Sequence, residues 1–106
     1  MKHKIILTET AKRDFVDTAN YISESLHNKS AAIDLITAAR TSIKTLVDMP
    51  ARHPLVEDAF LSKQGFRLLP VGNYLIFYVV NDVRRTVVIH RFLYSRRDWM
   101  NILSEK

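Results

Sequence analysis

The feature that most constrains the fold is a pair of apolar stripes at helical spacing with a very short connection between them. The first stripe consists of Ala11, Phe15, Ala19, Ile22 and Leu26. The second consists of Ala32, Ile36, Ala39, Ile43, Leu46 and Val47. Thr8 is placed to cap the first helix and Ser30 the second, and Pro50 disfavours helical geometry in the residue before it. Because His27-Asn28-Lys29-Ser30 alone separates the stripes, they predict an antiparallel helical hairpin.

After Pro50 the apolar pattern changes from helical to alternating. We expect an irregular connection over 51–64 and strands over 66–71, 74–80 and 86–93, with tight turns between the strands. Pro70 limits the first of these strands to a sheet edge or a bulge, whereas 74–80 is apolar on both faces, as in a central strand.

The two ends of the chain add a strand and a helix to this pattern. Residues 4–7 are apolar and β-branched, which favours a first strand, and Ser95-Arg96-Arg97-Asp98 resembles a capping box before a short helix through Trp99. The sequence therefore predicts a single α+β domain over 1–106. In it, an N-terminal strand and the antiparallel helical hairpin pack on a small, mainly antiparallel β-sheet, with a short C-terminal helix.

Composition excludes several classes of protein. The chain has no cysteine, which excludes a disulfide scaffold, a cysteine nucleophile and a Cys-based zinc site. Its histidines are scattered and it has no Gly-rich phosphate loop, so we expect neither a metal nor a cofactor. The longest apolar run, Leu75 to Val80, is far shorter than the ~20 residues of a membrane span, and the N-terminus lacks a signal-peptide core. We therefore expect a cytoplasmic protein that does not bind membranes.

The net charge of +5 lies entirely in the second half of the chain. Residues 1–59 carry eight Lys and Arg against eight Asp and Glu, whereas residues 60–106 carry eight against three. Five arginines fall within fourteen residues, interleaved with His90, Tyr94 and Trp99. We interpret this stretch as a surface for an acidic partner or a nucleic acid. Its binding residues would be Arg84, Arg85, Arg91, Arg96, Arg97 and Trp99.

Local structure assigns different roles to these arginines. Strand alternation places Arg91 on one face with Ile89 and Leu93, where a guanidinium is costly unless it is paired or solvated. The same alternation places on the other face Val88, His90 and Phe92. The capping box places Arg96 and Arg97 in the first helical turn, where backbone N–H groups favour an anion. A structural alternative is that Arg91 or Arg97 pairs with an acid, such as Asp98, Asp58 or Glu57.

Two side chains in this region could also carry proton chemistry. Tyr94 follows the strand beside the arginines and could stack on a base or act as a general acid or base. His90 could titrate near neutrality. A purely structural role for each is the alternative.

The motifs together resemble a known family. Gly-Asn-Tyr-Leu-Ile-Phe-Tyr-Val-Val at 72–80 and Val-Ile-His-Arg-Phe-Leu-Tyr-Ser-Arg-Arg-Asp-Trp at 88–99 are similar to the RelE/ParE superfamily of toxins from type II toxin–antitoxin systems. The resemblance extends from Ile5 to Leu103. It implies the RelE/ParE-like fold and a small antitoxin with an acidic segment, which would cover the basic sheet and the C-terminal face.

The resemblance implies one of two activities. RelE-like members are metal-independent ribonucleases that cut mRNA in the ribosome, whereas ParE-like members poison DNA gyrase. Leu75 stands where RelE-like enzymes carry an arginine, which favours the gyrase poison. As a ribonuclease, the chain would use as catalytic residues Arg67, Arg91, Tyr94 and Arg97, with His90 as an alternative to the tyrosine. A third possibility is a non-toxic homologue that only binds its partner.

Overall fold

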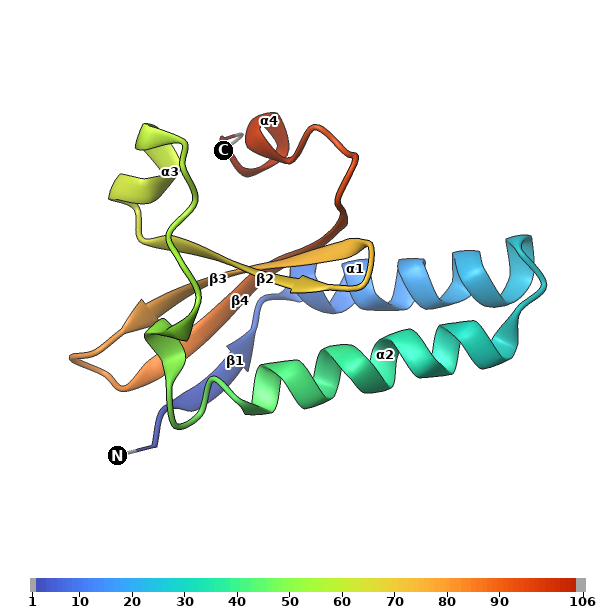
Figure 1. Cartoon of the computed structure of the whole chain (residues 1–106), viewed down its shortest axis with the longest axis horizontal. Helices are drawn as coiled ribbons and strands as arrows, with labels where there is room; N and C mark the ends of the chain where they lie inside the picture. Colours follow the sequence, from blue (N-terminus) through green and yellow to red (C-terminus); the bar gives the residue numbers. More distant parts are fainter. Residues whose placement is uncertain (1, 105–106) are drawn as a thin grey trace.

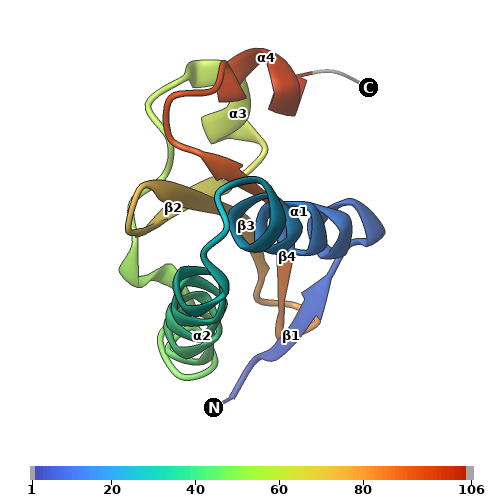
Figure 2. The same cartoon turned by 90° about the vertical axis from the view of Figure 1, so that its right-hand side faces the viewer.

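In the computed structural model, which describes residues 2–104, a four-stranded sheet lies between a helical hairpin and a pair of short helices (Figures 1 and 2). The strands are β1 (Lys4–Leu7), β2 (Phe66–Val71), β3 (Tyr74–Asn81) and β4 (Thr86–Tyr94). The α-helices are α1 (Glu9–Asn20), α2 (Lys29–Lys44), α3 (Ala59–Lys63) and α4 (Trp99–Ser104). A π-helical turn η1 (Tyr21–Ser25) follows α1, and a 3₁₀ turn η2 (Pro50–Arg52) follows α2. The α+β class is confirmed.

The hairpin of α1 and α2 forms as its apolar stripes predict, and its tip extends beyond the sheet (Figure 1). Thr8 caps α1 by accepting a hydrogen bond from the backbone N–H of Ala11 at 3.0 Å. The prediction that Ser30 caps the second helix is wrong. Asn28 does so, accepting from the N–H of Ala31 at 3.0 Å, and Ser30 lies inside the first turn.

The two stripes also run past the ends of the helices. In the first stripe Leu26 lies beyond η1, whereas Leu46 and Val47 of the second lie in the turn that follows α2. Leu46 is nevertheless fully buried. Apolar spacing therefore identified most of the residues that reach the core, but Leu26 is 56% exposed and Leu46 reaches the core from a turn.

The sheet has the order β1-β4-β3-β2, with β1 parallel to β4 and the other pairs antiparallel. The strand with Pro70 is at an edge and β3 is central, as predicted. The face toward the hairpin carries the larger core cluster, which includes Leu69, Ile76, Tyr78, Ile89 and Phe92. The opposite face carries Phe66, Phe77 and Leu93 under α3 and α4. Burial on both faces explains why β3 is apolar from Tyr74 to Val80.

Two local predictions fail in the second half of the chain. The connection expected to be irregular contains α3, which Asp58 caps through a bond from the N–H of Leu61 at 3.0 Å. The capping box at 95–98 does not form, because α4 begins at Trp99. The N–H of Arg97 instead donates to the carbonyl of Tyr94 at 3.0 Å. Arg96 and Arg97 therefore lie in a turn before the helix rather than in its first turn.

A β-bulge overturns the predicted alternation of β4. Ile89 pairs with Tyr78 and Arg91 pairs with Phe77, which leaves His90 as the extra residue. From this point the faces exchange, so Ile89 and Phe92 share the hairpin face. His90 turns to the other face, where its ring lies 5.1 Å from that of Phe66.

No helix within residues 2–104 is long and apolar enough to cross a bilayer.

Candidate functional site

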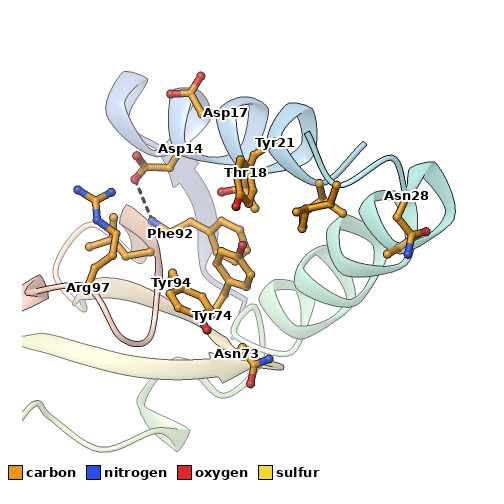
Figure 3. Close-up of a pocket in the computed structure, with 14 residues that line it drawn as sticks. Asp14, Asp17, Thr18, Tyr21, Asn28, Asn73, Tyr74, Phe92, Tyr94 and Arg97 are labelled. Carbon is orange, nitrogen blue, oxygen red and sulfur yellow. Dashed lines mark hydrogen bonds between the residues drawn. The ribbon is translucent and has the colours of Figure 1, made fainter. Parts of the chain in front are cut away.

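An open groove of about 850 Å³ lies between the tip of the hairpin and the ends of β3 and β4 (Figure 3). We call it the aromatic groove. The sheet contributes to its wall the side chains of Asn73, Tyr74, Phe92, Leu93, Tyr94 and Arg97. The hairpin contributes Asp14, Asp17, Thr18, Tyr21, Ile22, Leu26, Asn28 and Ala31.

Three aromatic residues of the sheet line the groove, Tyr74, Phe92 and Tyr94, and they belong to a ladder of rings that continues into the core. Phe15 of α1 stacks on Phe92 with ring centroids 4.3 Å apart, and Phe92 stacks on Tyr74 at 5.0 Å. Tyr94 meets Tyr74 edge-on at 5.4 Å and is 39% exposed at the open end. Burial raises the pKa of Tyr74, and the phenols of Tyr94 and Tyr21 raise that pKa further. Tyr74 therefore stays a neutral hydrogen-bonding group at pH 7.

Asp14 fixes the wall of the groove on the hairpin side. Its carboxylate accepts bonds from Arg91 Nε at 2.7 Å and Nη2 at 3.0 Å, and from the backbone N–H of Phe92 at 3.0 Å. The last of these is drawn in Figure 3. The pairing of β1 with β4 ends at Ile89, so β1 does not reach the N–H of Phe92. The carboxylate of Asp14 accepts its hydrogen bond instead. Arg91 is therefore paired, as the structural alternative held, but with an acid of α1 that we did not consider.

Arg67 is also engaged within the fold. Its Nη1 donates to the carbonyl of His53 at 2.7 Å and lies 3.5 Å from that of Ala51. The hydroxyl of Tyr78, on the neighbouring strand, donates to the carbonyl of Pro50 at 2.7 Å. Both side chains tie the sheet to the segment after α2. Arg67 and Arg91 are therefore held by different partners, Arg67 by the carbonyl of His53 and Arg91 by the carboxylate of Asp14.

The arginine cluster of the sequence separates into two regions. Arg84 and Arg85 lie in the β3–β4 turn, whereas Arg96 and Arg97 follow the other end of β4. At about 3.3 Å per residue, the length of β4 puts these ends about 25 Å apart. Within residues 2–104, Arg96 and Arg97 are exposed and form no ion pair.

The remaining candidates have structural contacts. Trp99 is partly buried, and its ring lies 5.2 Å from that of Phe77 in the core under α4. Desolvation by burial lowers the pKa of His90, so this side chain is neutral at pH 7. Among the residues that the structure describes, no group of three His, Asp or Glu is placed to hold a metal ion. Of the proposed catalytic set, the aromatic groove brings together Tyr94 and Arg97.

Our reading of the sequence missed Asp14, Asp17 and Tyr21. A signal for Asp14 was present, because it lies three residues after Ala11 and next to Phe15, on the buried side of a predicted helix. A carboxylate at core spacing needs a partner. Asp17 and Tyr21 follow Asp14 at helical spacing and so share its side of the hairpin.

Comparisons with known proteins agree with this fold. Residues 5–99 match the family model of the ParE toxin of the type II toxin–antitoxin system parDE. The RelBE2 toxin–antitoxin complex from Mycobacterium tuberculosis has a TM-score of 0.60 at 20% identity, over 89% of this chain and 99% of that chain. A chromosomal ParDE system from P. aeruginosa has a TM-score of 0.69 at 15% identity, over 88% and 96%. No curated protein matches the sequence.

Proposed function

Because the chain belongs to the ParE toxin family of type II toxin–antitoxin systems, we propose that it inhibits growth by poisoning DNA gyrase. The observation that supports this choice over a ribonuclease is that two of the proposed catalytic arginines already have structural partners within the fold. Arg67 donates to backbone carbonyls and Arg91 is held by Asp14. Leu75, at the position of the RelE-like arginine, packs in the core under α3 and α4.

A ribonuclease needs several charged groups around one phosphate. It must hold the pentavalent phosphate in a clamp of cations and move protons at two oxygens. Tyr94 and Arg97 line one groove and could supply one donor and one cation. Such a pair makes an incomplete clamp, and this favours a binding role for the region.

For that binding role we assign the exposed turn before α4. Arg97 lines the aromatic groove with Tyr94, and Arg96 precedes it in the same turn with an exposed side chain. Guanidinium groups pair bidentately with carboxylates and with phosphates. The turn could therefore contact gyrase or its bound DNA. An antitoxin that covers this turn with an acidic segment would block that contact, and the two similar solved structures are toxin–antitoxin complexes.

Two assays on the purified chain test the proposal. We expect inhibition of gyrase-catalysed supercoiling and no cleavage of mRNA on translating ribosomes. Cleavage of mRNA with unaffected supercoiling would establish the ribonuclease instead. If the chain neither inhibits supercoiling nor cleaves mRNA, and growth is normal when it is induced, the chain is a non-toxic homologue that only binds its partner.

Charge reversal tests the assigned turn. Arg96→Glu with Arg97→Glu should raise the concentration that half-inhibits gyrase at least tenfold, because two attractive contacts become repulsive. Arg52→Glu with Lys63→Glu is the matched control, since both residues are exposed and lie outside the groove. An equal loss in both double variants would show that net charge alone matters, and our assignment would be wrong.

A further inference from the structure

The β3–β4 turn lies at the end of the molecule that is opposite to the tip of the helical hairpin (Figure 1). It comprises residues 82–85, between the last residue of β3 and the first of β4. The pairing of β2 with β3 stops at Val79, and the pairing of β1 with β4 begins at Thr86. Neither edge strand therefore extends past the start of the turn, which forms the tip of a two-stranded ribbon.

The backbone of this turn is held in place by contacts from both sides. The side-chain oxygen of Asn81 accepts a hydrogen bond from the N–H of Arg84 at 3.0 Å. The carbonyl of Arg85 accepts one from the N–H of Lys4 at 2.8 Å. Arg85 has φ +52°, in the left-handed region where glycine is favoured, and these contacts hold it there. The turn therefore presents its side chains from a preorganised backbone, so a ligand does not have to order it.

Four cations gather around the turn and face solvent. Two acids lie at the same end, Asp82 in the turn and Asp48 after α2. The carboxylate of Asp82 accepts a hydrogen bond from Nε2 of His3 at 3.1 Å, so it is directed to the N-terminal segment. Among residues 2–104 none of the four cations forms an ion pair. The four are Lys2, Lys4, Arg84 and Arg85.

The tip of the ribbon carries one apolar side chain. Val83 is 95% exposed, more than any other large hydrophobic residue that the structure describes. A protein partner needs an apolar core of contact, and this turn offers a single valine among charges. Paired strands lie about 4.8 Å apart, so a two-stranded ribbon fits the major groove of DNA, which is about 12 Å wide. There an apolar tip meets thymine methyl groups while the flanking cations meet phosphates.

We propose that the β3–β4 turn binds duplex DNA, with the ribbon in the major groove. Val83 contacts base edges, and the arginines and lysines around it contact the phosphates beside the groove. This contact is separate from the one assigned to Arg96 and Arg97, which follow the other end of β4. It needs no gyrase, whereas a contribution of the ribbon to gyrase poisoning rests on the proposed function.

Titration of a labelled duplex tests DNA binding by the wild-type chain. The probe is a fluorescein-labelled duplex of about 20 base pairs, and fluorescence anisotropy measures its affinity at several NaCl concentrations. We expect the logarithm of the binding constant to fall linearly with the logarithm of the salt concentration, with a slope of about −2 to −4 for two to four phosphate contacts. Absence of binding at about 50 mM NaCl, where such contacts are strong, would overturn the proposal.

Removal of charge tests the position of the contact. Arg84→Gln with Arg85→Gln should weaken binding tenfold or more and make the salt slope shallower by about 1–2. Arg13→Gln with Lys29→Gln is the matched control, because it removes the same charge from exposed positions of the helical hairpin, and it should weaken binding less than threefold. Circular dichroism verifies that each variant is folded. Equal losses in the two double variants would show that net charge alone binds DNA and would overturn the proposal.

Replacement of the valine tests the insertion of the tip. Val83→Ser changes an exposed side chain, so the fold is unaffected, and it should weaken binding at least threefold. The salt slope should stay unchanged, since no charge is lost. An affinity equal to that of the wild type would show that the tip does not enter the groove and would overturn the proposal.

Two other anionic partners serve as comparisons. Polyglutamate represents an acidic protein and vesicles of phosphatidylglycerol represent a membrane surface. We expect both to bind the wild-type chain at least tenfold more weakly than the duplex does at the same salt concentration. Tighter binding of either one would assign the turn to that partner and overturn the proposal. The DNA titration contains no gyrase, so failure of the supercoiling assay leaves its result standing.

Discussion

We expect that replacing Asp14 destabilises the fold through the loss of one defined set of hydrogen bonds. Its carboxylate accepts three hydrogen bonds, two from Arg91 and one from the N–H of Phe92. The side chains of Asp14 and Arg91 are 12% and 23% exposed, so solvent replaces these bonds poorly. Removing one partner of a buried pair costs about 3–5 kcal/mol, and partial exposure reduces that figure. We expect Asp14→Ala to lower the free energy of unfolding by about 3 kcal/mol and Asp14→Asn by about 2 kcal/mol.

Urea unfolding followed by circular dichroism measures this loss. The control is Asp17→Asn, because Asp17 lies one turn away on the same helix and is exposed, and it should change stability by less than about 0.5 kcal/mol. A double-mutant cycle of Asp14→Leu and Arg91→Met should give a coupling energy of about 1–3 kcal/mol. Additive effects, or an Asp14→Asn variant as stable as wild type, would refute the structural role of the pair.

Three further predictions follow from single contacts. Burial lowers the pKa of His90 below its usual value of 6.5, so the unfolded chain takes up protons first and stability falls as the pH drops below about 6.5. Thermal unfolding by circular dichroism at pH 7 and 5 should show a smaller drop in Tm for His90→Asn than for wild type, whereas an unchanged drop would contradict this reasoning. Trp99→Ala should lower the free energy of unfolding in urea by about 2–3 kcal/mol and the exposed Met100→Ala by less than about 0.5 kcal/mol, and equal losses would argue against a packed α4. Gly65 has φ +86°, so Gly65→Ala should cost about 1 kcal/mol in the same assay, and a neutral result would mean that this turn relaxes freely.

The elements were predictable because their signals are local. Helical spacing of apolar residues gave α1 and α2, and apolar character on both faces identified β3 as central. The bulge at His90 was not predictable in this way, since an extra residue changes the facing of a strand without changing its composition. The structure also pairs Arg91 with Asp14, a partner 77 positions away in the sequence. Pairing across such a distance depends on how α1 crosses β4, which no local pattern encodes.

The site was less predictable because proximity in the sequence is a poor measure of proximity in a strand. Arg85 and Arg96 are eleven positions apart, but β4 lies between them and extends at about 3.3 Å per residue. The same eleven positions in an α-helix would span about 16 Å. Basic residues that are this close in the sequence can therefore form one surface when they lie on a helix. When a strand separates them, they form two surfaces. An assignment of strand to 86–93 already implied the separation that the structure shows.

The same geometry explains why the net charge of the first half is misleading. Eight cations and eight anions cancel along residues 1–59, but successive helical residues point about 100° apart. Lys12 and Asp14 therefore point to different sides of α1. Asp14 and Asp17 line the aromatic groove, whereas Lys12 lines a separate hollow of the hairpin. A partner that approaches the hairpin meets one side at a time and responds to the charge of that side.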